Sequence, residues 1–205
     1  MDVGIARLWW VQAAKAKQND KGLHLMNRWQ YILAAIGAIA ILGITNKDLI
    51  MDTWDRFTNR RIRNLHPIIR DKVSGAINRL DRMGIKVRIT KDGHFRSFEL
   101  QDELYAIGRT KDLHLPKVTN ARAGESWHNY ALAVDVVEIK NGKALWSNPR
   151  WEIIAREFER EGFEWGGRWT RKDRPHFQFR NGLSISQAKN IYLNGQRDAR
   201  GFILV

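Results

Sequence analysis

The sequence contains no cysteine, and only 4 of its 205 residues are proline. Without cysteine there is no disulfide scaffold, no zinc ribbon and no cysteine nucleophile, so any metal must be held by histidines and carboxylates. Hydrophobic residues make up 43% of the chain and charged residues 28%, which is too apolar for a disordered or collagen-like protein. The length suits one well-buried domain with an appendage, so we expect a single main core.

Acidic residues are in deficit, because 35 Lys and Arg face 22 Asp and Glu, which leaves a net charge of +13. Such a balance favours polyanionic surroundings such as nucleic acid, anionic lipid or an acidic cell-wall polymer, although a merely solvated basic surface is an equal alternative. The sequence contains no recognisable nucleic-acid-binding module. We therefore expect no nucleic-acid partner.

One long run without charge stands apart, the segment WQYILAAIGAIAILGIT at 29–45. Its length is at the lower limit for spanning a bilayer, and the basic residues before it favour a cytoplasmic N-terminus. A buried core helix, or a helix that docks onto a phage particle or secretion machinery, are the alternatives. We expect residues 1–60 to form an N-terminal extension that carries this membrane anchor or docking helix.

Residues 61–205 alternate between helix and strand patterns. Residues 46–66 are polar and indicate a connector or helical stalk. Caps and hydrophobic periodicity predict helices at 67–84, 97–108, 149–162 and 184–195, and strands at 85–90, 131–139 and 176–180, with a hairpin turn at Asn141-Gly142. Mixed elements with a hairpin predict an α+β domain that has a mainly antiparallel sheet flanked by helices.

Two short fragments carry the residues suited to chemistry. His128 precedes Asp135 by seven residues, and Asp135 lies between two valines of an apolar strand. A carboxylate is costly to bury there unless a metal or an arginine neutralises it. In the second fragment Asp173 precedes His176 by three residues. Two histidine nitrogens and one carboxylate oxygen make a catalytic zinc site with an open position, and a further carboxylate can deprotonate water.

The motifs FRSFELQDELYAIGRT (95–110), KVTNARAGESWHNYALAVDVV (117–137) and GFEWGGRWTRKDRPHFQF (162–179) resemble the LAS-type zinc peptidases. That family includes D-alanyl-D-alanine carboxypeptidases and the L-alanyl-D-glutamate endopeptidases of phage endolysins, and the resemblance runs from about Leu65 to Tyr192. It implies the LAS-type fold, zinc as the cofactor and a set of matched site residues. These are the zinc ligands His128, Asp135 and His176, the catalytic carboxylate Asp173, and Arg96, which binds substrate and stabilises the oxyanion.

Four further positions bear on the site. Ala131 stands where relatives commonly have glycine, and Arg168 stands where an acidic residue is common, which we expect to change the charge of the cleft. Ser126, two residues before His128, is a candidate to hydrogen-bond a ligand or the substrate, or only to stabilise its loop. Trp169 is a candidate to stack on substrate, with ordinary packing as the alternative.

The resemblance implies a zinc metallopeptidase that hydrolyses a peptide bond of the peptidoglycan stem, and the L-alanyl-D-glutamate bond is the expected one. A D-alanyl-D-alanine carboxypeptidase and a non-enzymatic cell-wall-binding module are the alternatives. Peptidoglycan is the expected partner. The expected location is the cell envelope or periplasm, reached by membrane anchoring or by phage delivery.

Overall fold

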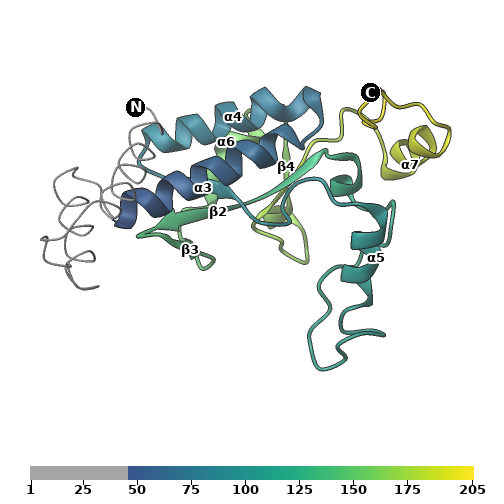
Figure 1. Cartoon of the computed structure of the whole chain (residues 1–205), viewed down its shortest axis with the longest axis horizontal. Helices are drawn as coiled ribbons and strands as arrows, with labels where there is room; N and C mark the ends of the chain where they lie inside the picture. Colours follow the sequence, from purple (N-terminus) through teal and green to yellow (C-terminus); the bar gives the residue numbers. More distant parts are fainter. Residues whose placement is uncertain (1–45) are drawn as a thin grey trace, which may run out of the picture. The chain divides into compact units, whose positions relative to one another are not determined.

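The computed structural model describes residues 46–205 (Figure 1). The apolar run at 29–45 lies outside the described residues. Among those described, no helix is long and apolar enough to cross a membrane. The elements in chain order are α3 (Asn46–Arg63), α4 (Pro67–Arg82), β1 (Val87–Ile89), α5 (Phe98–Ala106), η2 (Trp127–Tyr130), β2 (Ala133–Lys140), β3 (Lys143–Leu145), α6 (Trp151–Glu159), β4 (Glu164–Trp165), η3 (Gly166–Arg168), β5 (His176–Gln178) and α7 (Ile185–Leu193).

The strands form one five-stranded antiparallel sheet around β2. Its order is β1-β2-β5-β4, and β3 pairs with the far end of β2. The hairpin turn at Asn141-Gly142 joins β2 and β3 as the sequence predicts, and both residues have positive φ. The predicted α+β class with a mainly antiparallel sheet is therefore confirmed, although β4 is too short for sequence periodicity to indicate it.

Helices α4 and α6 pack together against the sheet, and α3 lies beside α4 (Figure 1). The predicted apolar faces of α4 and α6 are buried there, and the ring of Phe158 in α6 stacks on Phe177 in β5 with centroids 4.4 Å apart. Burying a large side chain of this kind contributes about 2–3 kcal/mol, so these contacts fix the sheet beneath the site. The core around them includes Ile69, Val73, Leu80, Ile89, Val134, Val136 and Ile154.

Helix α3 packs against the outer edge of β1, where the sequence indicated only a connector or stalk. The main-chain N–H of Ile89 donates to the buried Thr58 hydroxyl at 3.3 Å, and Arg61 donates to the Ile89 carbonyl at 2.8 Å. Polar side chains of α3 thus hydrogen-bond to main-chain groups at the edge of the sheet that would otherwise lack partners. This explains why a polar helix packs against the sheet. Residues 46–205 form one compact unit, which contains all of α3.

Arg88 of β1 is a charged side chain that is buried where the strand contacts the helices. Apolar residues alternate with charged or polar ones at 85–90, a pattern that would turn Arg88 toward solvent, whereas Arg88 is only 4% exposed. It is buried because Asp55 of α3 and Asp81 of α4 both accept hydrogen bonds from it. The ion pairs explain how a charged residue occupies the interface between the helices and the strand.

His66 joins the start of α4 to the C-terminal segment. Its Nδ1 accepts from the main-chain N–H of Ile68 at 3.3 Å, and its Nε2–H donates to the carbonyl of Ile203 at 2.9 Å. The bond to Nδ1 needs the neutral ring, because a protonated Nδ1 cannot accept, and burial lowers the pKa of His66. The neutral form therefore serves as the N-cap of α4.

Glu138 is a buried carboxylate of β2 that lies outside the site. Its side chain is 2% exposed. Its Oε2 accepts from Asn148 at 2.8 Å and from Arg150 at 3.0 Å, just before α6. The ion pair of Glu138 with Arg150 thus links the sheet to the N-terminus of α6.

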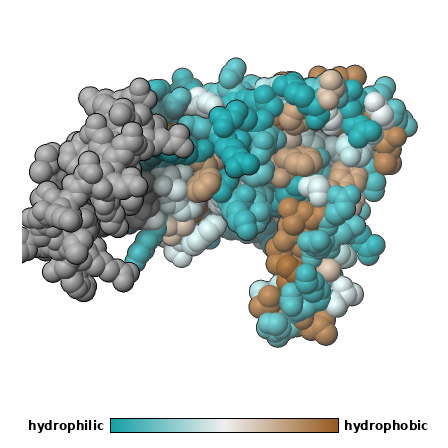
Figure 2. All heavy atoms as spheres, in the orientation of Figure 1, coloured by the Kyte–Doolittle hydropathy of each residue, from teal (hydrophilic) through white to brown (hydrophobic). Residues whose placement is uncertain are grey.

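A long loop at 107–126 follows α5 and projects from the rest of the folded unit (Figure 1). Figure 2 shows hydrophobic side chains gathered on it, where Leu113, Leu115 and Val118 are exposed. Residues 118–121 of this loop form one wall of the cleft described next.

Candidate metal centre

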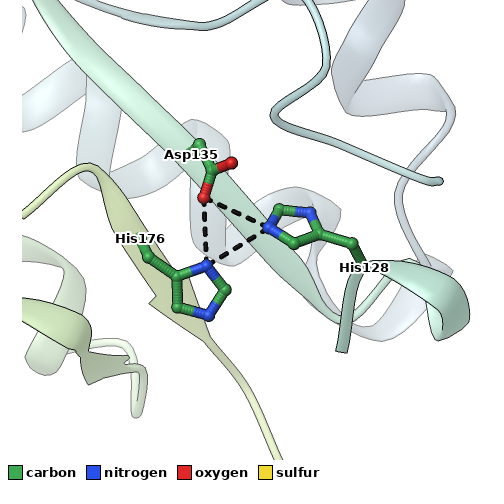
Figure 3. Close-up of side chains that lie close together, drawn as sticks. All are labelled: His128, Asp135 and His176. Carbon is green, nitrogen blue, oxygen red and sulfur yellow. Dashed lines mark hydrogen bonds and ion pairs between the residues drawn. The ribbon is translucent and has the colours of Figure 1, made fainter. Parts of the chain in front are cut away.

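Three side chains from separate elements converge at the centre of β2 (Figure 3). His128 lies on the single turn η2, Asp135 lies in β2, and His176 begins β5 directly opposite Asp135. His128 Nε2 and His176 Nδ1 are 3.2 Å apart, and they lie 3.1 and 3.0 Å from Asp135 Oδ1. The structure thus brings together the three residues that the sequence singled out as metal ligands.

The donor set fits a tetrahedral cation. Ligand atoms about 2.0–2.1 Å from zinc lie about 3.3 Å from one another at tetrahedral angles, close to the spacing seen here. His128 Nδ1 donates to the carbonyl of His94 at 2.8 Å, and His176 Nε2 donates to Gln178 Oε1 at 3.2 Å. Both histidines therefore turn a lone pair toward Asp135, and three acceptors that face one another are the arrangement a divalent cation requires.

The charges around the cluster agree with this assignment. Burial raises the pKa of Asp135, but His128 and His176 outweigh it and hold that pKa well below its usual value. Burial lowers the pKa of His128. Burial also lowers the pKa of His176, yet the negative charges of Asp135 and Asp173 leave it raised overall. The centre therefore holds an ionised carboxylate that attracts positive charge.

Asp173 lies in the tight turn between η3 and β5 and faces the same cleft. Its main-chain N–H donates to the carbonyl of Gly166 at 3.0 Å, and a Cβ on Gly166 would lie 2.6 Å from the Asp173 carbonyl oxygen. No described residue hydrogen-bonds its carboxylate. Burial and, next, the charge of Asp135 raise the pKa of Asp173. A carboxylate that has a raised pKa and no hydrogen bond to the described residues is suited to accept and return a proton.

Arg96 lies on the other side of Asp135. Its Nη2 donates to Asp135 Oδ2 at 2.5 Å, and its Nε donates to the carbonyl of Asp92 at 2.8 Å. The sequence left open whether a metal or an arginine neutralises Asp135. The structure provides for both, because Oδ1 faces the histidines and Oδ2 faces Arg96. The Nη1 of Arg96 makes no hydrogen bond to the described residues and remains available in the cleft.

The three ligand candidates, Asp173 and Arg96 line one cleft of about 660 Å³. Ser126 and Trp169 also line it, and no described residue hydrogen-bonds the Ser126 hydroxyl. The Trp169 ring is 39% exposed and its centroid is 5.2 Å from that of His176. Both side chains are therefore free to contact a bound substrate.

Glycine 93 and Ala131 shape the backbone beside the centre. A Cβ on Gly93 would lie 2.5 Å from the Asp135 carbonyl oxygen, so only glycine allows this approach. Ala131 has φ +57, in the left-handed region that glycine adopts without strain, and it ends the turn that carries His128.

Other charged candidates lie elsewhere than the sequence suggested. Arg168, expected to change the charge of the cleft, does not line it; it pairs instead with Glu152 and Glu159 at the molecular surface. Another charged side chain, Glu125, does line the cleft, and it accepts from the main-chain N–H of Arg122 at 3.0 Å. Arg168 therefore acts on α6 and not on the substrate site.

Sequence reasoning missed three residues of the site. Arg171 and Lys172 line the cleft and have no acidic partner among the described residues. Gln178 lies two residues beyond His176 on the same face of β5. Because side chains two residues apart share one face of a strand, the sequence could have identified Gln178 as the partner of His176. The two cations stand in a loop, where no periodicity indicates the direction of a side chain.

Comparison with known proteins gives a consistent set of relatives. The family model of D-alanyl-D-alanine carboxypeptidases matches residues 119–179, which include His128, Asp135, Asp173 and His176. The peptidoglycan L-alanyl-D-glutamate endopeptidase CwlK of Bacillus subtilis (strain 168) is 40% identical over 126 residues, covering 56% of this chain and 73% of CwlK.

Two solved structures are similar at a lower level. The L-Ala D-Glu endopeptidase ChiX of Serratia marcescens is 27% identical with a TM-score of 0.43, over 64% of this chain and 90% of ChiX. VanY, a D,D-pentapeptidase of a VanB-type vancomycin resistance cassette in complex with Zn(II), is 18% identical with a TM-score of 0.45, over 64% of this chain and 79% of VanY.

Proposed function

The chain belongs to the peptidoglycan peptidase family of CwlK, and from this membership and its site we propose that it is a zinc-dependent L-alanyl-D-glutamate endopeptidase of the peptidoglycan stem. The observation that carries the proposal is the unbonded Asp173 carboxylate, which shares a cleft with the cluster of His128, Asp135 and His176. A binding module would gain nothing from a proton acceptor placed there.

The roles of the side chains follow from their bonding. His128, Asp135 and His176 would hold zinc, which acts there as a Lewis acid that polarises a carbonyl and makes water easier to deprotonate. Asp173 takes a proton from the attacking water and returns it to the leaving amine. The free Nη1 of Arg96 donates to the oxygen on which negative charge develops.

The unpaired cations of the cleft agree with a glutamate beside the cleaved bond. A glutamate within a peptide keeps one carboxylate that is not part of the chain. Arg171 and Lys172 line the cleft without an acidic partner among the described residues, so they can pair with that carboxylate. Ser126 and Trp169 would hold the peptide on either side of the reacting carbonyl.

Peptidoglycan digestion would test the bond cleaved. Mass spectrometry of purified muropeptides treated with the full-length protein should show products with a new amino-terminal glutamate. Release of a terminal alanine alone would instead support the D-alanyl-D-alanine carboxypeptidase. The cell envelope or periplasm is the location we propose, because peptidoglycan is the proposed partner.

A substitution at Asp173 would test the mechanism. Asp173→Asn keeps the shape of the side chain but cannot accept the proton, so kcat should fall about 10²- to 10⁴-fold while zinc stays bound. The matched control is Asp112→Asn in the loop of 107–126, which should keep full activity. Zinc content and steady-state kinetics measured side by side decide the outcome. An active Asp173→Asn enzyme would contradict the role given to this carboxylate.

A further inference from the structure

A chain of hydrogen bonds runs from His176 to the molecular surface. His176 Nε2 lies 3.2 Å from Gln178 Oε1, and Gln178 Nε2 donates to Glu164 Oε2 at 2.9 Å. Arg180 then donates to Glu164 Oε1 at 2.6 Å. Glu164 stands opposite Gln178 in the pairing of β4 with β5, so the antiparallel register aligns this chain. Neither Glu164 nor Arg180 lines the cleft.

The direction of the chain is set at its outer end. Arginine can only donate and an ionised carboxylate can only accept, so Glu164 must receive a hydrogen bond from the nitrogen side of the Gln178 amide. The oxygen of that amide consequently faces His176. An oxygen there can only accept, which places the ring proton on Nε2 of His176. The lone pair of Nδ1 is then left to face Asp135 and His128 (Figure 3).

The tautomer of His128 does not depend on a side-chain amide. Its Nδ1 is 2.8 Å from the main-chain carbonyl of His94, which cannot exchange its acceptor for a donor. Gln178, in contrast, has an oxygen and a nitrogen of nearly equal size, and a half turn of its amide would present a donor to His176. That turn would move the ring proton to Nδ1, where it would block the position of the cation.

We propose that Glu164 and Gln178 are positioning residues that fix the tautomer of His176 and thereby its readiness to bind zinc. The proposal rests on the metal centre of the proposed function. It also gives a role to Glu164, a carboxylate that does not line the cleft. Outer partners of this kind change metal affinity about 10- to 100-fold when they are altered.

The test uses Glu164→Gln in the full-length protein. A glutamine at this position can donate as well as accept, so the Gln178 amide loses its fixed direction. We expect zinc affinity, measured by competition with a chelator, to fall about 10-fold or more. In the metal-free protein, ¹⁵N NMR of the imidazole nitrogens should show part of His176 protonated at Nδ1. Glu159→Gln, which alters a carboxylate bound to Arg168 at the surface, is the matched control and should change neither measurement.

A second substitution separates direction from mere structure. When Gln178→Glu is added to Glu164→Gln, the side chain at position 178 can only accept a hydrogen bond from His176. The amide at position 164 can then donate to that carboxylate. Zinc affinity and the Nε2–H tautomer should then return toward the wild type. Unchanged zinc affinity and an unchanged tautomer in Glu164→Gln would overturn the proposal. Wild-type protein that binds no zinc would overturn the proposed function instead, so the two failures are distinguishable.

Discussion

Removing Arg150 should destabilise the protein because it strands a buried charge. Glu138 is 2% exposed in the middle of β2, and its Oε2 accepts hydrogen bonds from Arg150 and Asn148. In Arg150→Ala only the Asn148 bond remains. Leaving one member of a buried ion pair without its partner costs about 3–5 kcal/mol. Since Arg150 is 34% exposed and water can reach its place, we expect a loss of about 2–3 kcal/mol.

The assay is urea unfolding together with thermal unfolding. For a protein of this size the loss should lower Tm by about 5–10 °C without changing the slope of the urea transition. Arg168→Ala is the control, because Arg168 pairs with two carboxylates that are exposed at the surface, and it should leave Tm almost unchanged.

A second variant isolates the charge from the contacts. Adding Glu138→Gln to Arg150→Ala removes the stranded charge and keeps a hydrogen-bonding partner for Asn148. More than half of the lost stability should return if the charge is the cause. The reasoning fails if Arg150→Ala is no less stable than Arg168→Ala, or if the double variant is less stable than the single one.

Three further predictions concern the metal, the pH and the N-terminal segment. His128→Ala and His176→Ala should lower zinc affinity and hydrolysis together, and chelation should abolish a hydrolysis that added zinc restores; full activity of metal-free protein would contradict the metal centre. Burial lowers the pKa of His66 from 6.5, so its stabilising effect is complete above that pH and is lost as the pH falls through the lowered pKa. When the pH is lowered from about 7.5 to about 5.5, the Tm of His66→Gln should therefore fall less than the Tm of the wild type. An equal fall in Tm would count against the neutral cap. Full-length protein should partition into membranes through residues 29–45, whereas a protein of residues 46–205 should not; monodisperse full-length protein without detergent would refute the anchor.

Local sequence patterns were sufficient for most of the helices. Ser97 and Ser184 cap α5 and α7 by accepting main-chain N–H bonds, and Ser184 forms a capping box with Gln187. Such signals act within one turn of helix, so they do not depend on the rest of the molecule. The edge strand β1 shows the opposite case, because only the packing of α3 makes Arg88 a buried residue.

For the site, the sequence by itself determined which residues can do chemistry. The spacings of His128 with Asp135 and of Asp173 with His176 point to the right types of group, and the absence of cysteine limits the possible ligands. Only the tertiary structure decided that these groups meet, since the antiparallel register of β2 and β5 sets Asp135 opposite His176. It also decided that Glu164 is not among the residues that line the cleft. Side-chain direction in short strands and loops follows from pairing with distant segments, which no local pattern records.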